Sequence, residues 1–185
     1  TATVRYNRFA LNTGPSVVEV SANQINLVNN RITDNTLSGI DFVSAARLNF
    51  LDSESAVLAV NNTIANNSGG PGLLIRDSGH DSDKISEVSN NIVWGNGFPQ
   101  IQLTDFNYAD NSLMLNGNVY SSISHPPPGG GLFNSGADPL FLSPEEGVYN
   151  LHPTSAAINS GVPIQFGTTP TQDLDGNARI VGSAI

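Results

Sequence analysis

The chain consists of short runs of alternating apolar and polar residues, separated by Asn-rich corners. The clearest copy of this pattern is residues 60–67 (VNNTIANN), and it recurs at residues 28–35 (VNNRITDN) and 88–96 (VSNNIVWGN). Weaker copies occupy residues 6–12 and 115–121. The central apolar residues follow one another at intervals of 23, 32, 28 and 27 residues, and they are Phe9, Ile32, Ile64, Ile92 and Val119. Intervals in the range of about 20 to 50 residues predict stacked structural repeats.

Each repeat contains up to three short runs with the alternation of a β-strand. The second run falls at residues 16–20, 39–42, 72–75 and 100–103, and a third, weaker run falls at residues 47–51 and 82–88. No sustained helical stripe of apolar residues is present. Three strands per repeat predict an all-β fold: a parallel β-helix of about five coils over residues 1–122, with strands stacked about 4.8 Å apart.

One Asn stands two residues before the apolar centre in four of the repeats: Asn7, Asn30, Asn62 and Asn90. Asn tolerates the left-handed backbone of a sharp turn, and its amide both donates and accepts hydrogen bonds. The alignment therefore predicts an Asn ladder that links successive coils. The alternative is that the row presents its amides to a sugar.

The repeat stops at residues 126–131 (PPPGGG), which predict a connector. Five prolines beyond it exclude long helices, and they are Pro139, Pro144, Pro153, Pro163 and Pro170. Because the last coil of a β-helix has an unpaired edge, we expect residues 123–185 to form the connector and a non-repetitive C-terminal cap. Residues 173–177 (DLDGN) predict a turn, since the remaining ligands of a calcium loop are missing.

Residues 90–101 (NNIVWGNGFPQI) resemble the repeat of right-handed parallel β-helix proteins of the pectate-lyase-like superfamily. More narrowly, they resemble bacterial surface proteins with polymorphic-outer-membrane-protein-type repeats. The stretches ADPLF (137–141), YNLHPTSAAINSG (149–161) and DLDGNAR (173–179) are similar to the closing region of those proteins. The resemblance implies a single-stranded right-handed β-helix, an extracellular or bacterial cell-surface location, and a polysaccharide partner. Many members of this branch have no established activity.

Charge and composition narrow the partners further. The net charge of −9 disfavours binding to nucleic acid. Only 12% of the residues are charged, so the surface depends on uncharged polar groups, among them 23 Asn residues. The lack of Cys excludes disulfides, thiolate metal sites and a Cys nucleophile. No apolar run approaches the roughly 18 residues of a membrane span, and we expect a monomeric module of a longer chain because the sequence opens within a repeat.

Candidate chemistry lies at the ends of the second runs. If these runs stack in register, Asp41, Leu74 and Gln102 face outward. One step further, Arg76 is expected beside Thr104, and Asp77 beside Asp105. Two carboxylates on adjacent coils would lie about 5 Å apart, which is the separation that a retaining glycosidase uses.

Residues 78–84 (SGHDSDK) form the densest polar cluster of the chain. A polysaccharide lyase of this fold needs a base and commonly a calcium site. Arg76 or Lys84, with His80 nearby, are candidate catalytic groups, and Asp77, Asp81 and Asp83 are candidate calcium ligands. The alternative is ordinary turn chemistry, and no other cofactor is expected. The sequence has no nucleophile elbow, phosphate-binding loop or zinc motif.

Trp94 is the one tryptophan, and the alignment gives it the corner position of Asp34 and Asn66. Exposed there, its ring would suit the apolar face of a sugar; the alternative is that a loop or the cap covers it. The predicted carbohydrate-binding residues are Asp41, Trp94, Gln102, Asp105 and Tyr108.

Three functions therefore remain open. The first is a noncatalytic module of an exported or cell-surface protein that binds polysaccharide or adheres. The second is a polysaccharide lyase or glycoside hydrolase, or a fragment of one. The third is a structural stalk. Since the repeats contain no coherent acid–base constellation, the sequence favours the first.

Overall fold

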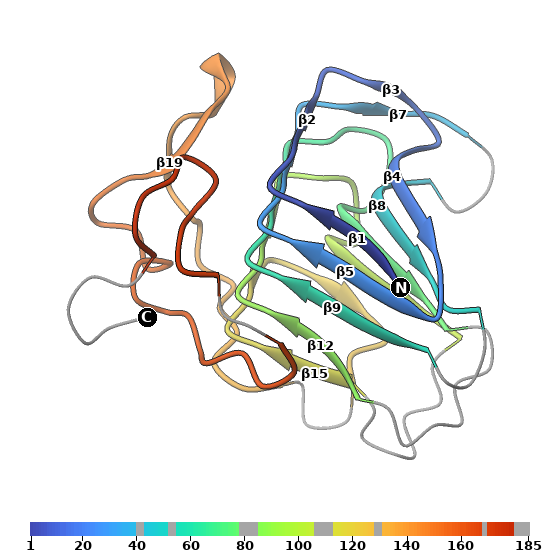
Figure 1. Ribbon diagram of the computed structural model, residues 1–185. Helices are drawn as coiled ribbons and strands as arrows, with labels where there is room; N and C mark the ends of the chain where they lie inside the picture. The colour runs from blue at the N-terminus through green and yellow to red at the C-terminus, as the bar shows by residue number, and fades with distance from the viewer. Residues whose placement is uncertain are drawn as a thin grey trace.

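The computed structural model describes residues 1–39, 43–51, 55–77, 85–105, 113–127, 131–167 and 170–179. They form an all-β parallel β-solenoid, followed by a C-terminal segment that lies along its flank (Figure 1). Three parallel sheets of five strands each form three faces. No α-helix occurs among these residues, and no helix is long and apolar enough to span a membrane.

The chain passes through the three faces in turn within each repeat. The first face stacks β1 (Ala2–Arg5), β5 (Gln24–Val28), β9 (Ala56–Val60), β12 (Ser86–Ser89) and β15 (Leu113–Asn116), as Figure 1 shows. The second face stacks β2 (Arg8–Ala10), β6 (Arg31–Thr33), β10 (Thr63–Ala65), β13 (Ile92–Trp94) and β16 (Val119–Tyr120). The third face stacks β4 (Ser16–Ser21), β8 (Ser44–Asn49), β11 (Leu73–Arg76), β14 (Ile101–Thr104) and β17 (Ile123–Ser124).

Shorter elements complete the fold. A two-residue parallel pair, β3 (Thr13–Gly14) and β7 (Thr36–Leu37), joins the first two coils between the second and third faces. In the C-terminal segment, β18 (Phe141–Ser143) and β19 (Val148–Leu151) form an antiparallel hairpin. The single-turn 3₁₀ helix η2 (Pro144–Glu146) connects them.

The core is a stack of aliphatic residues, because alternate residues of every strand point inward. In the second face Ile32 pairs with Ile64, and Ile64 pairs with Val93, all fully buried. The third face aligns Leu48 with Ile75 in the same way. Like residues therefore pack on like residues from coil to coil, which explains why the repeat is visible in the sequence.

The predicted Asn ladder is present at the corner between the first and second faces. It runs through Asn7, Asn30, Asn62, Asn91, Asn118 and Asn134. Each amide Nδ2 donates to the Oδ1 of the next member at 2.9 to 3.2 Å. Backbone N–H groups of the ladder residues donate to the same oxygens, as Asn62 does to Asn91 at 3.0 Å. The ladder thereby satisfies polar groups that the coil buries.

The prediction that Asn90 belongs to this ladder was wrong, because the alignment was shifted by one residue there. Ile92 pairs with Thr63, so Val93, and not Ile92, points into the core. Since strand residues alternate between faces, a one-residue shift exchanges inside and outside. Asn91 therefore joins the ladder, and Asn90 takes the left-handed corner before it, with φ of 59°.

A second ladder stands at the corner between the second and third faces. It consists of Asn12, Asn35, Asn67 and Asn96, with amide-to-oxygen distances of 2.7 to 3.0 Å, and it ends on Gln100. Each of its Asn residues follows a member of the first ladder by five residues, as Asn67 follows Asn62. The two ladders fix both ends of four second-face strands, β2, β6, β10 and β13.

The predicted register of residues 39–42 with residues 72–75 was wrong, because Leu73 and Ile75 pair with Ala46 and Leu48 instead, and residues 40–42 lie outside the described part of the chain. The third-face strand of this coil is β8, which includes most of the run predicted at residues 47–51 as a separate strand. In β8, Ala46 and Leu48 stand in register with Leu73 and Ile75 of the next coil. Packing against neighbouring coils therefore decided the strand.

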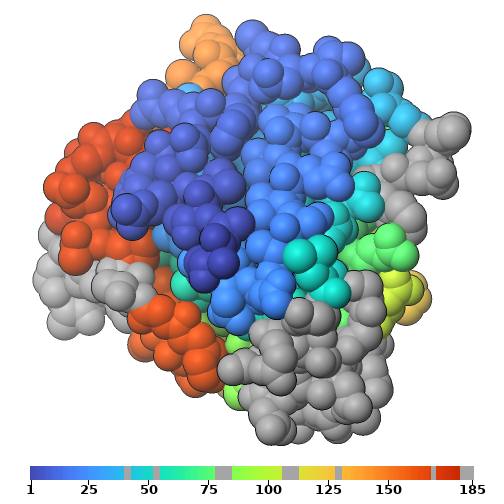
Figure 2. Space-filling model, turned by 45° about the vertical axis from the view of Figure 1, so that its right-hand side comes forward, coloured from blue at the N-terminus to red at the C-terminus, as the bar shows by residue number. Residues whose placement is uncertain are grey.

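The C-terminal segment differs from the expected cap in its position. Residues 131–135 do cover the last coil: Asn134 ends the first ladder, and Ser135 bridges to Val119. The remaining described residues turn back and lie beside the second face, close to the N-terminal strands in Figure 2. They consequently cover a flank, and their contacts create the site described below.

Ladder residues should dominate stability. Replacing Asn62 by Ala removes its bonds to Leu27 O and to Asn91, and it deprives Asn30 of an acceptor. We expect a loss of about 3 kcal/mol in the free energy of unfolding, measured with urea. The matched control is Asn26→Ala, which removes only an exposed bond to Thr3 and should cost at most about 0.5 kcal/mol. Equal losses for the two variants would contradict the role given to the ladder.

Candidate functional site

The predicted carboxylate pair lies at the end of the third face, but its members do not share an environment. Arg76 pairs with Thr104, and the N–H of Asp77 donates to Thr104 O at 3.0 Å, so the two aspartates follow one another on adjacent coils as expected. Asp77 is fully buried, whereas the side chain of Asp105 is 54% exposed and accepts a bond from Arg76 Nε at 3.0 Å. Asp105 has a left-handed backbone, with φ of 64°, which ends the strand alternation after Thr104.

The outer row of the third face is polar apart from the buried Leu74, and the described charges of this face are paired. Gln102 is partly exposed there, in register with Leu74 and, one coil further, with Arg47. Arg47 lies 3.4 Å from Glu19, and its Nε donates to Asn49 at 3.1 Å. This face therefore carries a network of surface charges that satisfy one another.

The aromatic candidate lies on a different face. Trp94 pairs with Ala65, which pairs with Thr33, so its predicted equivalence to the corner residues Asp34 and Asn66 was wrong. The one-residue shift again accounts for this, and Gly95 takes the left-handed corner instead. Trp94 is partly exposed on the outer side of the second face, away from Gln102 and Asp105.

Other predicted site residues lie outside the described part of the chain. They are Asp41, His80, Asp81, Asp83, Lys84 and Tyr108. Among the residues that the structure does describe, no three His, Cys, Asp or Glu side chains converge as a metal site.

A long groove runs between the second face and the C-terminal segment, and we call it the flank groove. It consists of three adjoining hollows of about 490, 300 and 280 Å³. Arg31 lines both the first and the second hollow, and Asn61, Leu151 and Arg179 line both the second and the third. The groove therefore follows the solenoid axis from the first coil to the last.

One wall of the flank groove is the outer row of the second face. Arg31, Thr63, Ile92 and Val119 succeed one another in register along it, one residue per coil. The spacing of strands in a sheet puts them about 4.8 Å apart. The opposite wall belongs to the C-terminal segment, which contributes Tyr149, Asn150, Leu151, Ala157, Ile158 and Asn159. Polar and aliphatic groups thus face each other along the second and third hollows, where Asp173, Asp175 and Arg179 add charged groups.

Corner asparagines fasten the C-terminal segment to the solenoid. Asn29, Asn61 and Asn90 occupy the left-handed corner in three successive coils, with φ of 58° or 59°. Asn29 Nδ2 donates to Gln172 O at 2.7 Å, and Asn90 exchanges two bonds of 2.8 Å with the backbone of Val162. The middle member, Asn61, keeps a buried Nδ2 that has no hydrogen-bond partner in the described structure.

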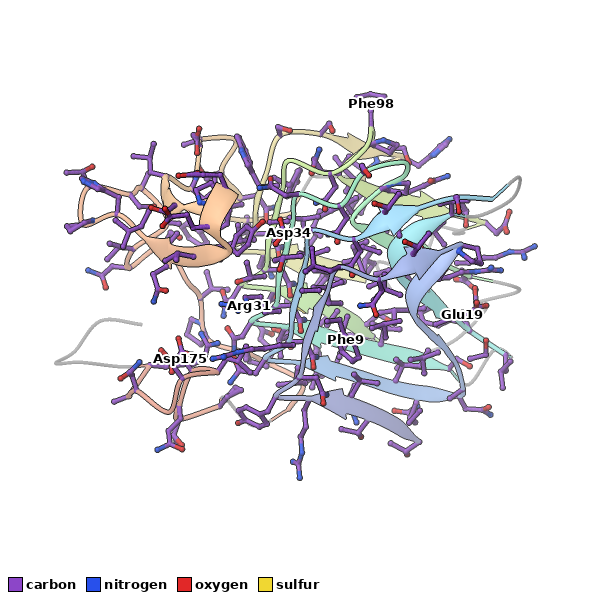
Figure 3. All side chains as sticks on the ribbon, turned by 90° about the horizontal axis from the view of Figure 1, so that it is seen from above. Phe9, Glu19, Arg31, Asp34, Phe98 and Asp175 are labelled. Atoms are coloured by element: carbon purple, nitrogen blue, oxygen red, sulfur yellow. The ribbon has the colours of Figure 1, made fainter. Side chains whose placement is uncertain are left out.

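Further polar contacts hold the same segment. Glu87 is buried on the outer side of the first face and accepts the N–H groups of Gln165 and Phe166 at 2.9 and 2.8 Å. Near the first coil, Arg8 forms an ion pair with Asp175. Figure 3 shows Asp175 on the side of the solenoid opposite to Glu19 of the third face.

Tyr149 connects the C-terminal segment to the solenoid across the flank groove. Its hydroxyl donates to Asp34 Oδ1, its ring meets that of Phe141 edge to face at 5.0 Å, and the Arg31 guanidinium lies 6.0 Å from its centre. Burial, followed by the bond to Asp34 and that carboxylate's charge, raises the pKa of Tyr149 well above its usual range. The phenol therefore stays protonated and keeps its bond at ordinary pH.

Two charged residues, Arg179 and Asp173, line the second hollow of the flank groove. Burial lowers the pKa of the Arg179 guanidinium, an effect that the charge of Asp173 opposes. Burial raises the pKa of Asp173, but bonds from the side chain and backbone of Asn177 and the backbone of Asp175 outweigh it and leave the pKa below its usual range. These bonds form the turn that the sequence predicted at residues 173–177.

The flank groove was not predicted from the sequence, although one signal for it exists. The corner residues are the first members of Asn–Asn pairs at 29–30, 61–62 and 90–91, and the second members form the ladder. A pair in which only one member can point inward predicts an outward amide on every coil. Nothing in the local pattern predicts that Arg179 meets Asn61, 118 residues away.

Comparison with known proteins gives one match. The family model described as "Right handed beta helix region" matches residues 1–120 of the chain. No curated protein and no solved structure matched it.

The Tyr149–Asp34 contact predicts a stability loss at alkaline pH. A folded-state pKa raised above the unfolded value of about 10 contributes stability that is complete below pH 10 and declines as the pH rises through the folded value. We expect the free energy of unfolding of the wild type to fall more steeply above pH 10 than that of Tyr149→Phe, which cannot titrate at this position. Urea unfolding at pH 9 to 11 measures it. Parallel pH profiles would disprove the assignment, because other tyrosines titrate in both proteins.

Proposed function

Since the chain belongs to the family of right-handed β-helix regions, we propose that it is a noncatalytic, polysaccharide-binding module of an exported or cell-surface protein. The observation that carries this proposal is the flank groove, an elongated depression with a repeating wall. We also infer a rod of about five coils, which the five strands of each face support. The resemblance of the repeat and closing stretches to bacterial surface proteins supports the location.

The chemistry of the flank groove suits a saccharide. Sugar rings present hydroxyl groups around their rim and C–H groups on their faces. Along the groove, Asn61, Arg31 and Asn159 offer polar groups, while Ile92 and Leu151 offer aliphatic surface. Binding sites that combine an apolar lining with a few placed polar groups are typical of small-molecule recognition.

The shape of the flank groove suits a chain in preference to a single sugar. Its three hollows adjoin one another along the axis, and its wall repeats with the coil spacing of about 4.8 Å. A polymer with a short repeat can place successive units against successive coils. This open, continuous form supports binding to the interior of a polysaccharide.

The three aspartates that line the flank groove already have partners, which favours binding over catalysis, while the exposed Glu145 and Glu146 line only its first hollow. Asp34 accepts from Tyr149, Asp175 pairs with Arg8, and Asp173 accepts from its own turn. On the third face Asp105 pairs with Arg76. A general base must be able to reach the proton that it removes. The hypothesis that the chain is a lyase or hydrolase therefore depends on residues 78–84. The hypothesis that it is a structural stalk predicts a flank without a groove.

Filling the flank groove with a larger side chain should weaken binding of the polysaccharide. Thr63 lies in its wall, so Thr63→Trp should weaken binding to whichever polysaccharide of an acidic and neutral panel the wild type retains, by about tenfold or more in affinity electrophoresis. The matched control is Thr104→Trp, which places the same ring on the outer row of the third face and should bind normally. Circular dichroism checks that both variants fold.

Two outcomes would refute the proposal. One is equal binding by the wild type and Thr63→Trp, with loss in Thr104→Trp, since this moves the site to the third face. The other is release of shortened or unsaturated products from the polysaccharide, followed by absorbance and chromatography, because turnover would make the chain an enzyme.

A further inference from the structure

We infer that the junction of the second and third hollows of the flank groove, between Asn61 and Arg179, binds an anionic oxygen group of the saccharide, either a carboxylate or a sulfate. This deepens the proposed function and rests on it, because it assigns the charge class of the ligand to named atoms of the same groove.

The first support is the corner row of asparagines. Asn29 and Asn90 use their side-chain amides to hold the backbone of the C-terminal segment. Asn61 stands between them and lines both the second and the third hollow. Its buried Nδ2 donor has no acceptor in the described structure. Leaving a buried donor unsatisfied costs the free energy of its desolvation. An acceptor from a ligand would remove that cost.

The second support is Arg179, on the other wall of the same junction. Its Nη2 donates to Asn29 Oδ1 and, at 3.4 Å, to Asn61 O, while its buried Nε has no hydrogen-bond partner among the described residues. Within that part of the chain, no carboxylate lies within 4.0 Å of its guanidinium. The neighbouring Asp173 directs both oxygens into its own turn. Asp173 therefore offsets part of the Arg179 charge from a distance, while the Nε–H of Arg179 remains for a ligand.

Together these groups prefer an anion to a hydroxyl. A carboxylate or sulfate has several acceptor oxygens, so it can serve both donors and compensate the half-buried charge at once. A neutral hydroxyl can satisfy the donors but adds nothing to the partial compensation of the charge by Asp173, and bonds to ionised acceptors are roughly twice as strong. Three of the six arginines, Arg8, Arg31 and Arg179, lie along this flank of a protein whose net charge is −9. The groove also contains carboxylates: Asp34, Asp173 and Asp175 already accept bonds from Tyr149, Asn177 and Arg8, and Glu145 and Glu146 line its first hollow.

The backbone supplies clean variants for a test. Asn61 has φ of 58°, which Asn, Asp and Gly tolerate, and the last coil has Gly117 at the equivalent corner with φ of 62°. Asn61→Gly therefore deletes the donor without backbone strain. Asn61→Asp keeps the shape but replaces the donor by a negative charge. Arg179→Gln removes the positive charge, and Arg47→Gln is the matched control on the third face.

Titration calorimetry with three matched probes tests the inference. They are an oligomer of glucuronic acid, its carboxyl-reduced form, and the reduced form after sulfation. We expect the wild type to bind at least one anionic probe about tenfold more tightly than the reduced probe, with an affinity that falls as salt rises. Asn61→Gly should reduce that preference, Arg179→Gln and Asn61→Asp should abolish it because each makes the site more negative by one charge, and Arg47→Gln should keep it. Whichever anionic probe binds more tightly shows whether the site prefers a carboxylate or a sulfate.

Failure of the inference differs from failure of the proposed function. Equal affinities for anionic and reduced probes, both weakened by Thr63→Trp, would overturn the anion site while keeping polysaccharide binding in the flank groove. If Arg179→Gln weakened all probes equally, Arg179 would merely hold the C-terminal segment, and the inference would again fall. Binding of none of the probes, nor of the polysaccharide panel, would overturn both.

Discussion

In every coil of this solenoid, the buried polar groups of the corner need hydrogen-bond partners, and the next coil supplies them. The chain turns sharply between the first and second faces, and the turn buries amide and carbonyl groups that water cannot reach. Asn62 resolves this by donating to Asn91 and to Leu27 O while accepting from Asn30. Stacked aliphatic residues then fill the space that the corners define. No coil can do this alone, so the ladder and the core form together.

The same constraint produces the candidate site. A ladder Asn inside the corner requires a left-handed residue just before it, and the sequence uses Asn there in three coils. Those residues point outward, so the flank acquires a row of amides at the coil spacing. The C-terminal segment binds two of them, through Val162 and Gln172, and stands far enough from the second face to leave the flank groove. Structure and candidate function therefore derive from one repeated pair of residues.

Sequence reasoning reached the fold because stacking makes like residues recur. It predicted the parallel solenoid, the Asn ladder and the pairing of Arg76 with Thr104. It misplaced Asn90 because both Asn90–Asn91 and Ile92–Val93 are pairs of similar residues, so the pattern fits two alignments and only packing distinguishes them. It missed the flank groove because the C-terminal segment has no repeat that could align it with the coils. The candidate site depends on the contact between Arg179 and Asn61, which is distant in sequence.

The location of saccharide binding on the second face is the central claim, and it contrasts with the third face that the sequence favoured. The most direct test is nuclear magnetic resonance of the isotope-labelled protein during titration with a bound oligosaccharide. The account predicts that the amide signals of Asn61, Ile92, Leu151 and Arg179 shift progressively and that those of Gln102, Thr104 and Asp105 stay in place. Shifts confined to Gln102, Thr104 and Asp105 would contradict it.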